Sequence, residues 1–148
     1  MHTGNGQTVK KISINELENY IKQSRKPLVI NFWATFCKPC LEEIPLMLEL
    51  ARTSPNVELI MVSLDMADYY PDKLEKFVSQ QQFQPAVQYW LNETNADFFC
   101  PKVDSAWQGS LPATLFINPQ KQYRQFVDKP MRQEEIRLSF LSLDATAN

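Results

Sequence analysis

Short apolar runs alternate with amphipathic segments along most of the 148-residue chain. Several runs have the composition of strands, because they are rich in apolar and β-branched residues and are bounded by polar or turn residues. They cover residues 9–14, 28–34, 57–64, 86–91 and 113–118. The nearly continuous run at 28–34 is typical of a strand that is buried on both faces of a parallel sheet. After a turn at 118–121, residues 122–127 alternate and predict an antiparallel partner strand.

Amphipathic segments separate these strands. Apolar side chains recur three or four positions apart in them, which predicts helices with one face against the sheet. They cover residues 16–22, 41–50, 73–78 and 132–143. We expect Asn15 and Asp72 to cap two of these helices, because short polar side chains accept hydrogen bonds from the first N–H groups. The pattern is weakest at 92–109, where it predicts two short helices, near 96–99 and 103–108.

The predicted order is βαβαβ, then the weakly patterned segment, then ββα. This order suits an α/β fold with a central mixed β-sheet and helices on both faces. The length suits one domain, and the sequence shows no repeats. We expect residues 9–148 to form this domain and residues 1–8 to be a flexible lead, because that lead is polar and holds two of the three glycines.

Charge and hydropathy exclude some function classes. The 15 basic and 17 acidic residues give a net charge of −2, which provides no basic surface for nucleic acid or an anionic membrane. No run approaches the ~18 apolar residues of a membrane span. The N-terminus lacks the basic and apolar regions of a signal peptide, and a mature secreted protein would look the same.

The strongest chemical signal is a pair of cysteines, Cys37 and Cys40, between an apolar run and a helical pattern. A helix N-terminus carries unpaired N–H groups and partial positive charge, which favour a thiolate. Two thiols in one helical turn can also close a disulfide with little rearrangement. We interpret Cys37, at the exposed first turn, as the attacking thiol. Cys40 lies one turn further in and would resolve the mixed disulfide.

A zinc site is the alternative for such a pair, but structural zinc needs four ligands. Only Cys100 and His2 remain as candidates, so we expect no metal and no other cofactor. Cys100 is better explained as a packed free thiol. Between the paired cysteines, Pro39 suits a first helical turn, and Lys38 adds a positive charge beside the attacking thiol.

The segment Phe32-Trp33-Ala34-Thr35-Phe36-Cys37-Lys38-Pro39-Cys40 resembles the active-site segment of the thioredoxin superfamily. The longer match, from Asn31 through Glu43 to Pro45, is closer to its extracytoplasmic branch. That branch holds the thioredoxin-like reductases of the bacterial cell envelope, including those that serve cytochrome c maturation. The resemblance implies a thioredoxin-like fold, thiol–disulfide exchange and a location in the cell envelope or periplasm. The chain departs from thioredoxin at Asn31, where thioredoxin has a buried Asp, and at Phe36, where Trp is usual.

The resemblance also implies roles for individual residues. In the envelope reductases, the Glu at the position of Glu43 sits near the cysteine pair and tunes its protonation. The alternative is that Glu43 is a solvated helix residue like Glu42. Leu111-Pro112 resembles the family's cis-proline loop, so Pro112 is expected to be cis and to face the cysteines. The backbone of Leu111 would then be open to an extended substrate segment.

Aromatic residues near the motif complete the expected substrate-binding set, which is Trp33, Phe36, Lys38, Pro39, Leu111 and Pro112. We expect Phe36 to be exposed and to form an apolar rim for a protein substrate. Trp33 is expected to pack partly under the loop, and burial in the core is an alternative for both. Trp107 is equally compatible with the rim and with the core.

We therefore predict a monomeric thiol–disulfide oxidoreductase that reduces disulfides in protein substrates and exchanges electrons with a second thiol–disulfide partner. Acidic residues near the pair, Glu42 and Glu43, oppose strong stabilisation of the thiolate and favour a reductant. A disulfide donor or isomerase with the same cysteines, or a binding module without turnover, remain alternatives. A peroxidase of this fold would carry Thr-x-x-Cys, whereas Thr35 precedes Cys37 by only two positions.

Overall fold

A six-stranded mixed sheet forms the centre of the computed structural model, which describes residues 7–146. The strand order is β1-β4-β3-β2-β5-β6. The strands are β1 Lys10–Ile12, β2 Leu28–Trp33, β3 Glu58–Ser63, β4 Val87–Leu91, β5 Ala113–Asn118 and β6 Tyr123–Val127. The first four strands along the chain pair in parallel, and β5 pairs antiparallel with both β2 and β6. The predicted mixed sheet and its C-terminal hairpin are confirmed.

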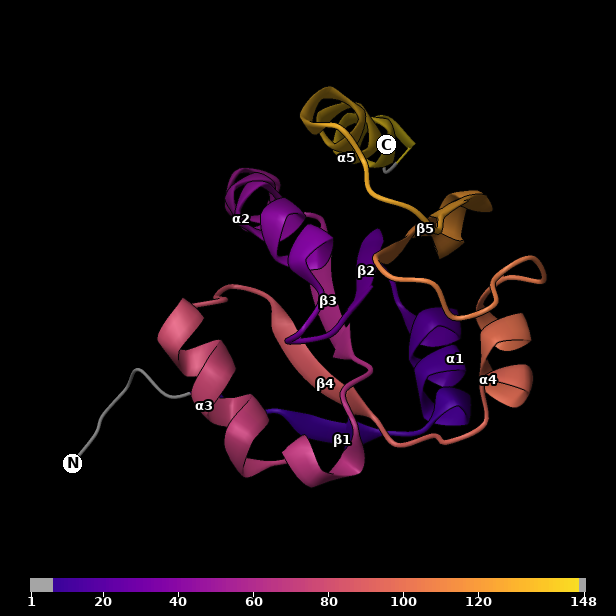
Figure 1. Ribbon diagram of the computed structural model, residues 1–148. Helices are drawn as coiled ribbons and strands as arrows, with labels where there is room; N and C mark the ends of the chain where they lie inside the picture. Colours follow the sequence, from indigo (N-terminus) through magenta and orange to yellow (C-terminus); the bar gives the residue numbers. More distant parts are fainter. Residues whose placement is uncertain (1–6, 147–148) are drawn as a thin grey trace.

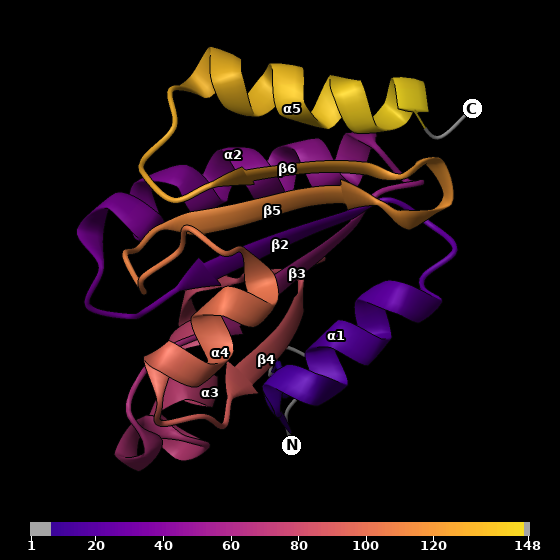
Figure 2. The ribbon, with the colours of Figure 1, turned by 90° about the vertical axis from the view of Figure 1, so that its right-hand side faces the viewer.

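Five helices cover both faces of this sheet. They are α1 Ile14–Gln23, α2 Lys38–Thr53, α3 Asp72–Gln81, α4 Ala96–Val103 and α5 Gln133–Thr146, with short 3₁₀ turns η1 Ala67–Tyr69 and η2 Pro119–Lys121. Side chains of α2, α3 and α5 share one hydrophobic cluster, and those of α1 and α4 share a second. Figures 1 and 2 show α2 and α5 together on one side of the sheet and α1 and α4 on the other.

Strand β2 holds the centre and leads directly to the cysteine pair. All six of its side chains are buried, as the continuous apolar run predicts. Because successive side chains of a strand point to opposite faces, Val29 and Trp33 enter the cluster below α2, whereas Ile30 and Phe32 enter the other. The chain thus leaves a strand fixed on both faces only a few residues before Cys37.

Two predicted helix caps are wrong. Helix α1 is capped by Ser13, whose hydroxyl accepts the N–H of Glu16 while the Glu16 carboxylate accepts the N–H of Ser13. This reciprocal capping box starts the helix before Asn15. Helix α3 begins at Asp72 itself, after Pro71, without a side-chain cap. Its acidic first turn still complements the helix dipole.

Only one of the two helices expected within 92–109 is present. Helix α4 covers 96–103, but residues 104–109 form a turn and not a second helix. The carboxylate of Asp104 accepts the N–H of Ala106, and its carbonyl accepts the N–H of Trp107. Aspartate commonly stabilises such turns by bonding to the backbone two residues on.

Most of the expected flexible lead, residues 1–6, lies outside the described part of the chain. Its last part is tied to the fold, because the N–H of Gln7 donates to the hydroxyl of Ser79, 2.9 Å away. Within residues 7–146, none of the helices has the length and apolar character needed to cross a bilayer.

Candidate active site

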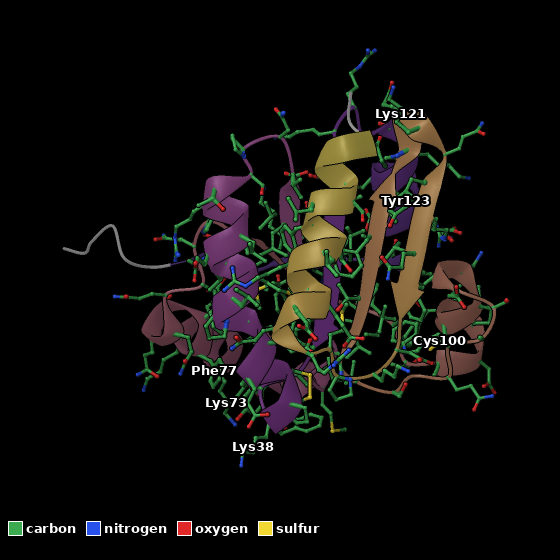
Figure 3. All side chains as sticks on the ribbon, turned by 90° about the horizontal axis from the view of Figure 1, so that it is seen from above. Lys38, Lys73, Phe77, Cys100, Lys121 and Tyr123 are labelled. Atoms are coloured by element: carbon green, nitrogen blue, oxygen red, sulfur yellow. A yellow bond between two sulfur atoms is a disulfide. The ribbon has the colours of Figure 1, made fainter. Side chains whose placement is uncertain are left out.

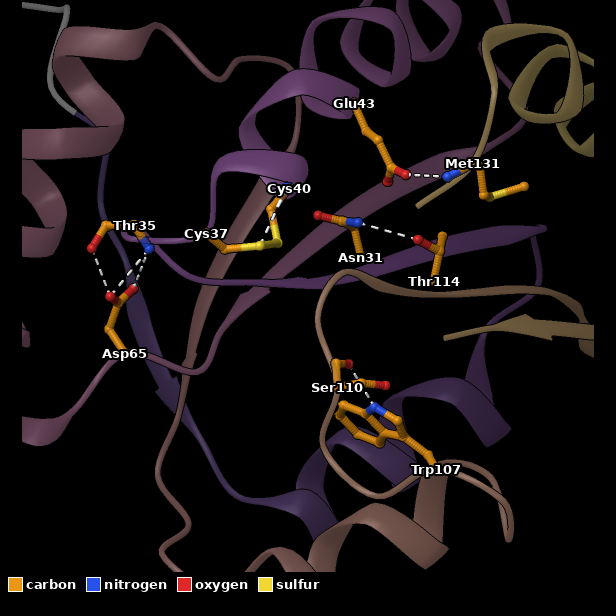
Figure 4. Close-up of a disulfide and its surroundings, with 10 residues drawn as sticks. All are labelled: Asn31, Thr35, Cys37, Cys40, Glu43, Asp65, Trp107, Ser110, Thr114 and Met131. Carbon is orange, nitrogen blue, oxygen red and sulfur yellow. Dashed lines mark hydrogen bonds between the residues drawn. A yellow bond between two sulfur atoms is a disulfide. The ribbon is translucent and has the colours of Figure 1, made fainter. Parts of the chain in front are cut away.

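Cys37 and Cys40 form a disulfide at the N-terminus of α2, with their Cα atoms 5.3 Å apart (Figure 4). Cys37 is the N-cap residue of the helix, and its Sγ accepts the N–H of Cys40 at 3.3 Å. Cys37 is 8% exposed, whereas Cys40 is fully buried. The structure confirms the predicted pairing, and Cys37 is the more exposed member of the pair.

The two residues between the cysteines are both exposed. Pro39 lies in the first turn of α2, as its missing N–H favours. Lys38 projects outward from the end of this helix (Figure 3). Both residues therefore stand on the surface that a substrate would approach.

Glu43, in the second turn of α2, is buried with only 5% of its surface exposed, whereas Glu42 is exposed. Its Oε2 accepts the N–H of Met131, 2.5 Å away, and its Oε1 has no hydrogen-bond partner within the described residues. Burial raises the pKa of Glu43 to about 7, although the Met131 hydrogen bond acts in the opposite direction. The interpretation of Glu43 as a solvated helix residue is therefore wrong.

The face of β2 beneath α2 carries two more buried polar atoms without a partner in the described chain, Asn31 Oδ1 and Trp33 Nε1. Asn31 is fully buried and its Nδ2 donates to the hydroxyl of Thr114 at 3.2 Å. In Figure 4 its oxygen lies on the side of Cys40 and its nitrogen on the side of Thr114. An amide at this position cannot titrate, whereas the carboxyl of Glu43, buried on α2, can.

Trp33 does not belong to a substrate-contacting surface. It is fully buried, and its ring packs against Phe77 and Phe83 with centroid distances of 5.9 and 5.5 Å. These contacts place it in the core below α2 and α3. The expectation that Trp33 binds substrate is wrong, because β2 directs its side chain inward.

Phe36 is 76% exposed, as the sequence predicts for an apolar rim. Met66, which the sequence analysis missed, is also 76% exposed. The two residues follow Thr35 and Asp65, which hydrogen bond to each other and so hold the two loops together. The signal for Met66 was its place just after β3, because neighbouring parallel strands end at the same edge of a sheet.

The Leu111–Pro112 peptide bond is cis, as the resemblance implied. Pro112 is buried and Leu111 is half-buried, and within residues 7–146 no hydrogen bond involves the backbone of Leu111. Trp107 is buried in the cluster below α1 and α4, and its Nε1 donates to the carbonyl of Ser110 at 2.9 Å. From Ser110 the chain rises toward the disulfide before it enters β5 (Figure 4).

The third cysteine plays no part in this arrangement. Cys100 is a buried free thiol on α4, on the other face of the sheet from α2 (Figure 3). Burial, with a contribution from the charge of Asp97, raises its pKa to about 11. Within residues 7–146, no three His, Cys, Asp or Glu side chains are grouped so that they could hold a metal ion.

The family model described as AhpC/TSA family matches residues 3–126. The chain belongs to the AhpC/TSA family. One curated relative is the thiol-disulfide oxidoreductase ResA of Oceanobacillus iheyensis, which is 31% identical over 104 residues. These residues are 69% of this chain and 49% of that protein. Chloroplastic thioredoxin Y2 of Arabidopsis thaliana is 28% identical over 111 residues, 75% of this chain and 59% of that protein. The chain thus spans about half the length of the curated relatives it matches.

Solved structures show the same thioredoxin-like fold. A secreted disulfide oxidoreductase of Mycobacterium tuberculosis, homologous to Escherichia coli DsbE, aligns with a TM-score of 0.61 and 22% identity over 81% of this chain and 84% of that one. A thioredoxin-related protein from Neisseria meningitidis aligns with a TM-score of 0.64 and 21% identity over 82% and 87%.

Proposed function

We propose that this chain is a thiol–disulfide oxidoreductase that reduces disulfides in protein substrates through Cys37 and Cys40. The observation that carries this proposal is the disulfide at the N-terminus of α2, with Cys37 as its more exposed member. The oxidoreductase and thioredoxin names of the relatives support it.

The exchange proceeds in two steps that conserve electrons. In the reduced protein, the Cys37 thiolate attacks one sulfur of the substrate disulfide, whose S–S bond breaks as a mixed disulfide forms. The second substrate sulfur leaves and takes up a proton. The Cys40 thiolate then attacks Sγ of Cys37, and the first substrate sulfur is released and protonated. The substrate gains two electrons and two protons, and the chain is left with the Cys37–Cys40 disulfide.

Two features of the site assist these steps. The N–H of Cys40 already points at Sγ of Cys37, and in the reduced protein the same hydrogen bond stabilises the attacking thiolate. The carboxyl of Glu43 lies buried on the same helix and has a pKa of about 7. This value suits a group that accepts the Cys40 proton when that thiol becomes the nucleophile.

The chain acts as a reductant in this proposal. A buried carboxylate near the pair opposes the thiolate, which destabilises the reduced protein and lowers the reduction potential. A second dithiol protein would return the chain to its reduced form by attack on Cys37. Exposed Phe36 and Met66, together with Lys38, Pro39 and the unpaired backbone of Leu111, would contact the substrate polypeptide.

We place the protein in the bacterial cell envelope or periplasm, where it acts as a monomer formed by a single domain. The extracytoplasmic resemblance of residues 31–45 supports this location, and one structural neighbour is named as secreted. Fractionation of cells that carry the full-length gene product tests it, and a signal confined to the cytoplasm would contradict it.

Trapping of a mixed disulfide tests the function. Reduced Cys40→Ser should accumulate a covalent complex with insulin that dithiothreitol releases, because Cys37 can attack but nothing resolves the product. Cys37→Ser should form no complex. The reduction potential of the pair, from glutathione and dithiothreitol buffers, then gives the direction of electron flow.

Each alternative function predicts a different result. A reduction potential near that of periplasmic oxidants would show that the chain is a disulfide donor or isomerase and not a reductase. A pair that forms no disulfide in any of these buffers, with no covalent complex, would leave only a binding module.

A further inference from the structure

Asp65, just beyond the end of β3, is a buried carboxylate with only 5% of its surface exposed. Its Oδ1 accepts the hydroxyl of Thr35 at 2.7 Å, and its Oδ2 accepts the hydroxyl of Ser63 at 2.6 Å. The N–H of Thr35 is shared between both oxygens, at 3.1 and 3.2 Å. A buried carboxylate needs such donors to offset the loss of its hydration, and these donors come mainly from the loop that carries the cysteines.

The backbone of Asp65 is also fixed on the opposite side. Its carbonyl accepts Nε1 of Trp90 at 2.7 Å, and its N–H donates to the hydroxyl of Ser63 at 3.0 Å. The ring of Trp90 stacks on Tyr70, with centroids 4.7 Å apart. The residue that carries the carboxylate is therefore held by Ser63 of β3 and Trp90 of β4.

Thr35 is two residues before Cys37, in the connection between β2 and α2. The N–H of Cys37 donates to the carbonyl of Ala34 at 3.1 Å, so the intervening residues form a tight turn. Asp65 holds the first N–H of this turn, and the pairing of β2 with β3 ends just before it, where the N–H of Leu64 donates to the carbonyl of Trp33. Asp65, just beyond β3, thus bonds to the turn that leads directly to Cys37, the N-cap of α2 (Figure 4).

We propose that Asp65 is a positioning residue for thiol–disulfide exchange: by holding Thr35, it fixes Sγ of Cys37 at the helix N-terminus and along the line of attack. The inference rests on the proposed function, because it concerns the reactivity of the same thiol. Displacement of a reacting group by about 1 Å can cost on the order of a hundredfold in rate. The carboxylate itself touches no reacting atom, and its effect passes through Thr35.

Asp65→Ala tests the proposal in the full chain. We expect kcat/KM for insulin reduction to fall about tenfold or more through kcat. The pH midpoint for alkylation of Cys37 by iodoacetamide should rise, because a loosened N-cap stabilises the thiolate less. Asp65→Asn keeps the volume but offers only one acceptor oxygen, and Thr35→Val removes only the hydroxyl bond. Both should give smaller changes in the same direction.

Glu75→Ala is the matched control. The carboxylate of Glu75 also accepts a backbone N–H, that of Val9 at 3.0 Å, but this contact precedes β1, which β4 and β3 separate from β2. The control should lower thermal stability and leave the Cys37 alkylation profile and kcat unchanged.

The proposal is overturned if Asp65→Ala lowers the thermal midpoint as Glu75→Ala does but keeps the alkylation profile and kcat of the unsubstituted protein. If Asp65→Ala does not fold, wild-type values in both Asp65→Asn and Thr35→Val overturn it. Failure of the proposed function would appear differently, as absence of insulin reduction by the unsubstituted protein. The alkylation profiles of reduced protein would still decide the role of Asp65.

Discussion

The backbone N–H of Met131 donates a hydrogen bond to Oε2 of Glu43, which lies 88 positions earlier in the chain. This contact joins the active-site helix to the segment that leads into α5. The single donor does not offset the burial of the carboxylate, because Oε1 has no partner within the described residues. The neutral acid is therefore favoured, and the pKa of Glu43 lies near 7 in place of its ordinary 4.5.

Glu43 should make the stability of the oxidised protein fall as the pH rises. Between pH 4.5 and about 7, the folded protein retains a proton that the unfolded chain has lost, so the free energy of unfolding decreases across this window and levels off above it. The full effect is on the order of 3 kcal/mol. Urea unfolding of Glu43→Gln at a series of pH values should lack this decrease.

Glu42→Gln is the control for this experiment, since Glu42 is the exposed neighbour on the same helix. It should keep the pH dependence of the unsubstituted protein. Equal slopes for Glu43→Gln and the unsubstituted protein would show that the carboxyl titrates normally in the fold.

Glu43→Gln should also raise the reduction potential of the cysteine pair at pH 8. In this variant no charged carboxylate opposes the thiolate, so the reduced protein is more stable. The reduction potential rises by about 30 mV for each 1.4 kcal/mol of this stabilisation. Equilibration with dithiothreitol and glutathione measures the change. If the potential does not change in Glu43→Gln, or changes equally in Glu42→Gln, then Glu43 has no specific effect on the redox chemistry.

Phe36→Ala should weaken protein substrates selectively. Its side chain is 76% exposed, so the free energy of unfolding should change by less than about 0.5 kcal/mol. KM for insulin should rise several-fold, whereas the rate with a small disulfide such as oxidised glutathione should stay constant. Leu138→Ala, an exposed leucine on α5, should leave both constants unchanged. Parallel losses with both substrates would point to a disturbed disulfide and not to a docking surface.

Trp33→Ala should destabilise the fold by about 3 to 5 kcal/mol, because it removes a fully buried ring from its contacts with Phe77 and Phe83. The milder Trp33→Phe should lower the midpoint of urea unfolding but keep KM for insulin. If Trp33→Phe instead raised KM for insulin without lowering stability, Trp33 would contact the substrate after all.

Native oxidised protein should show no thiol reactive toward Ellman's reagent at pH 8. Cys100 is 1% exposed and its pKa is about 11, so only about a thousandth of it is thiolate at that pH. Unfolding in guanidinium should release one thiol per chain, and Cys100→Ala should release none. A rapid reaction in the native state would show that α4 opens readily.

The sequence predicted the sheet well because its strands are short apolar runs between clear turns. It failed at 104–109, where local side-chain bonds of Asp104 override a weak helical pattern. The sequence also predicted the cysteine pair and the exposure of Phe36. It predicted the cis bond before Pro112 as well, but only through the resemblance to a known family.

Other parts of the site depend on contacts between distant segments, which one-dimensional patterns do not contain. Asp65 reads as an ordinary turn residue until β3 is placed beside β2. Trp33 alternates correctly into the core, but its proximity to the motif suggested a surface role. Glu43 and Glu42 are adjacent in sequence, and only the position of Met131 distinguishes the buried one.

The loop before Pro112 is anchored through Trp107 in the cluster below α1 and α4, whereas both paired cysteines belong to the cluster below α2. The loop whose backbone would bind substrate and the cysteine pair therefore meet at one edge of the sheet but are packed mainly in different clusters, and Leu111 contacts both clusters. Mutations behind the loop can diversify recognition during evolution without retuning the sulfur chemistry. For the same reason, protein engineers can redesign the loop and the cysteine-bearing end of α2 one at a time.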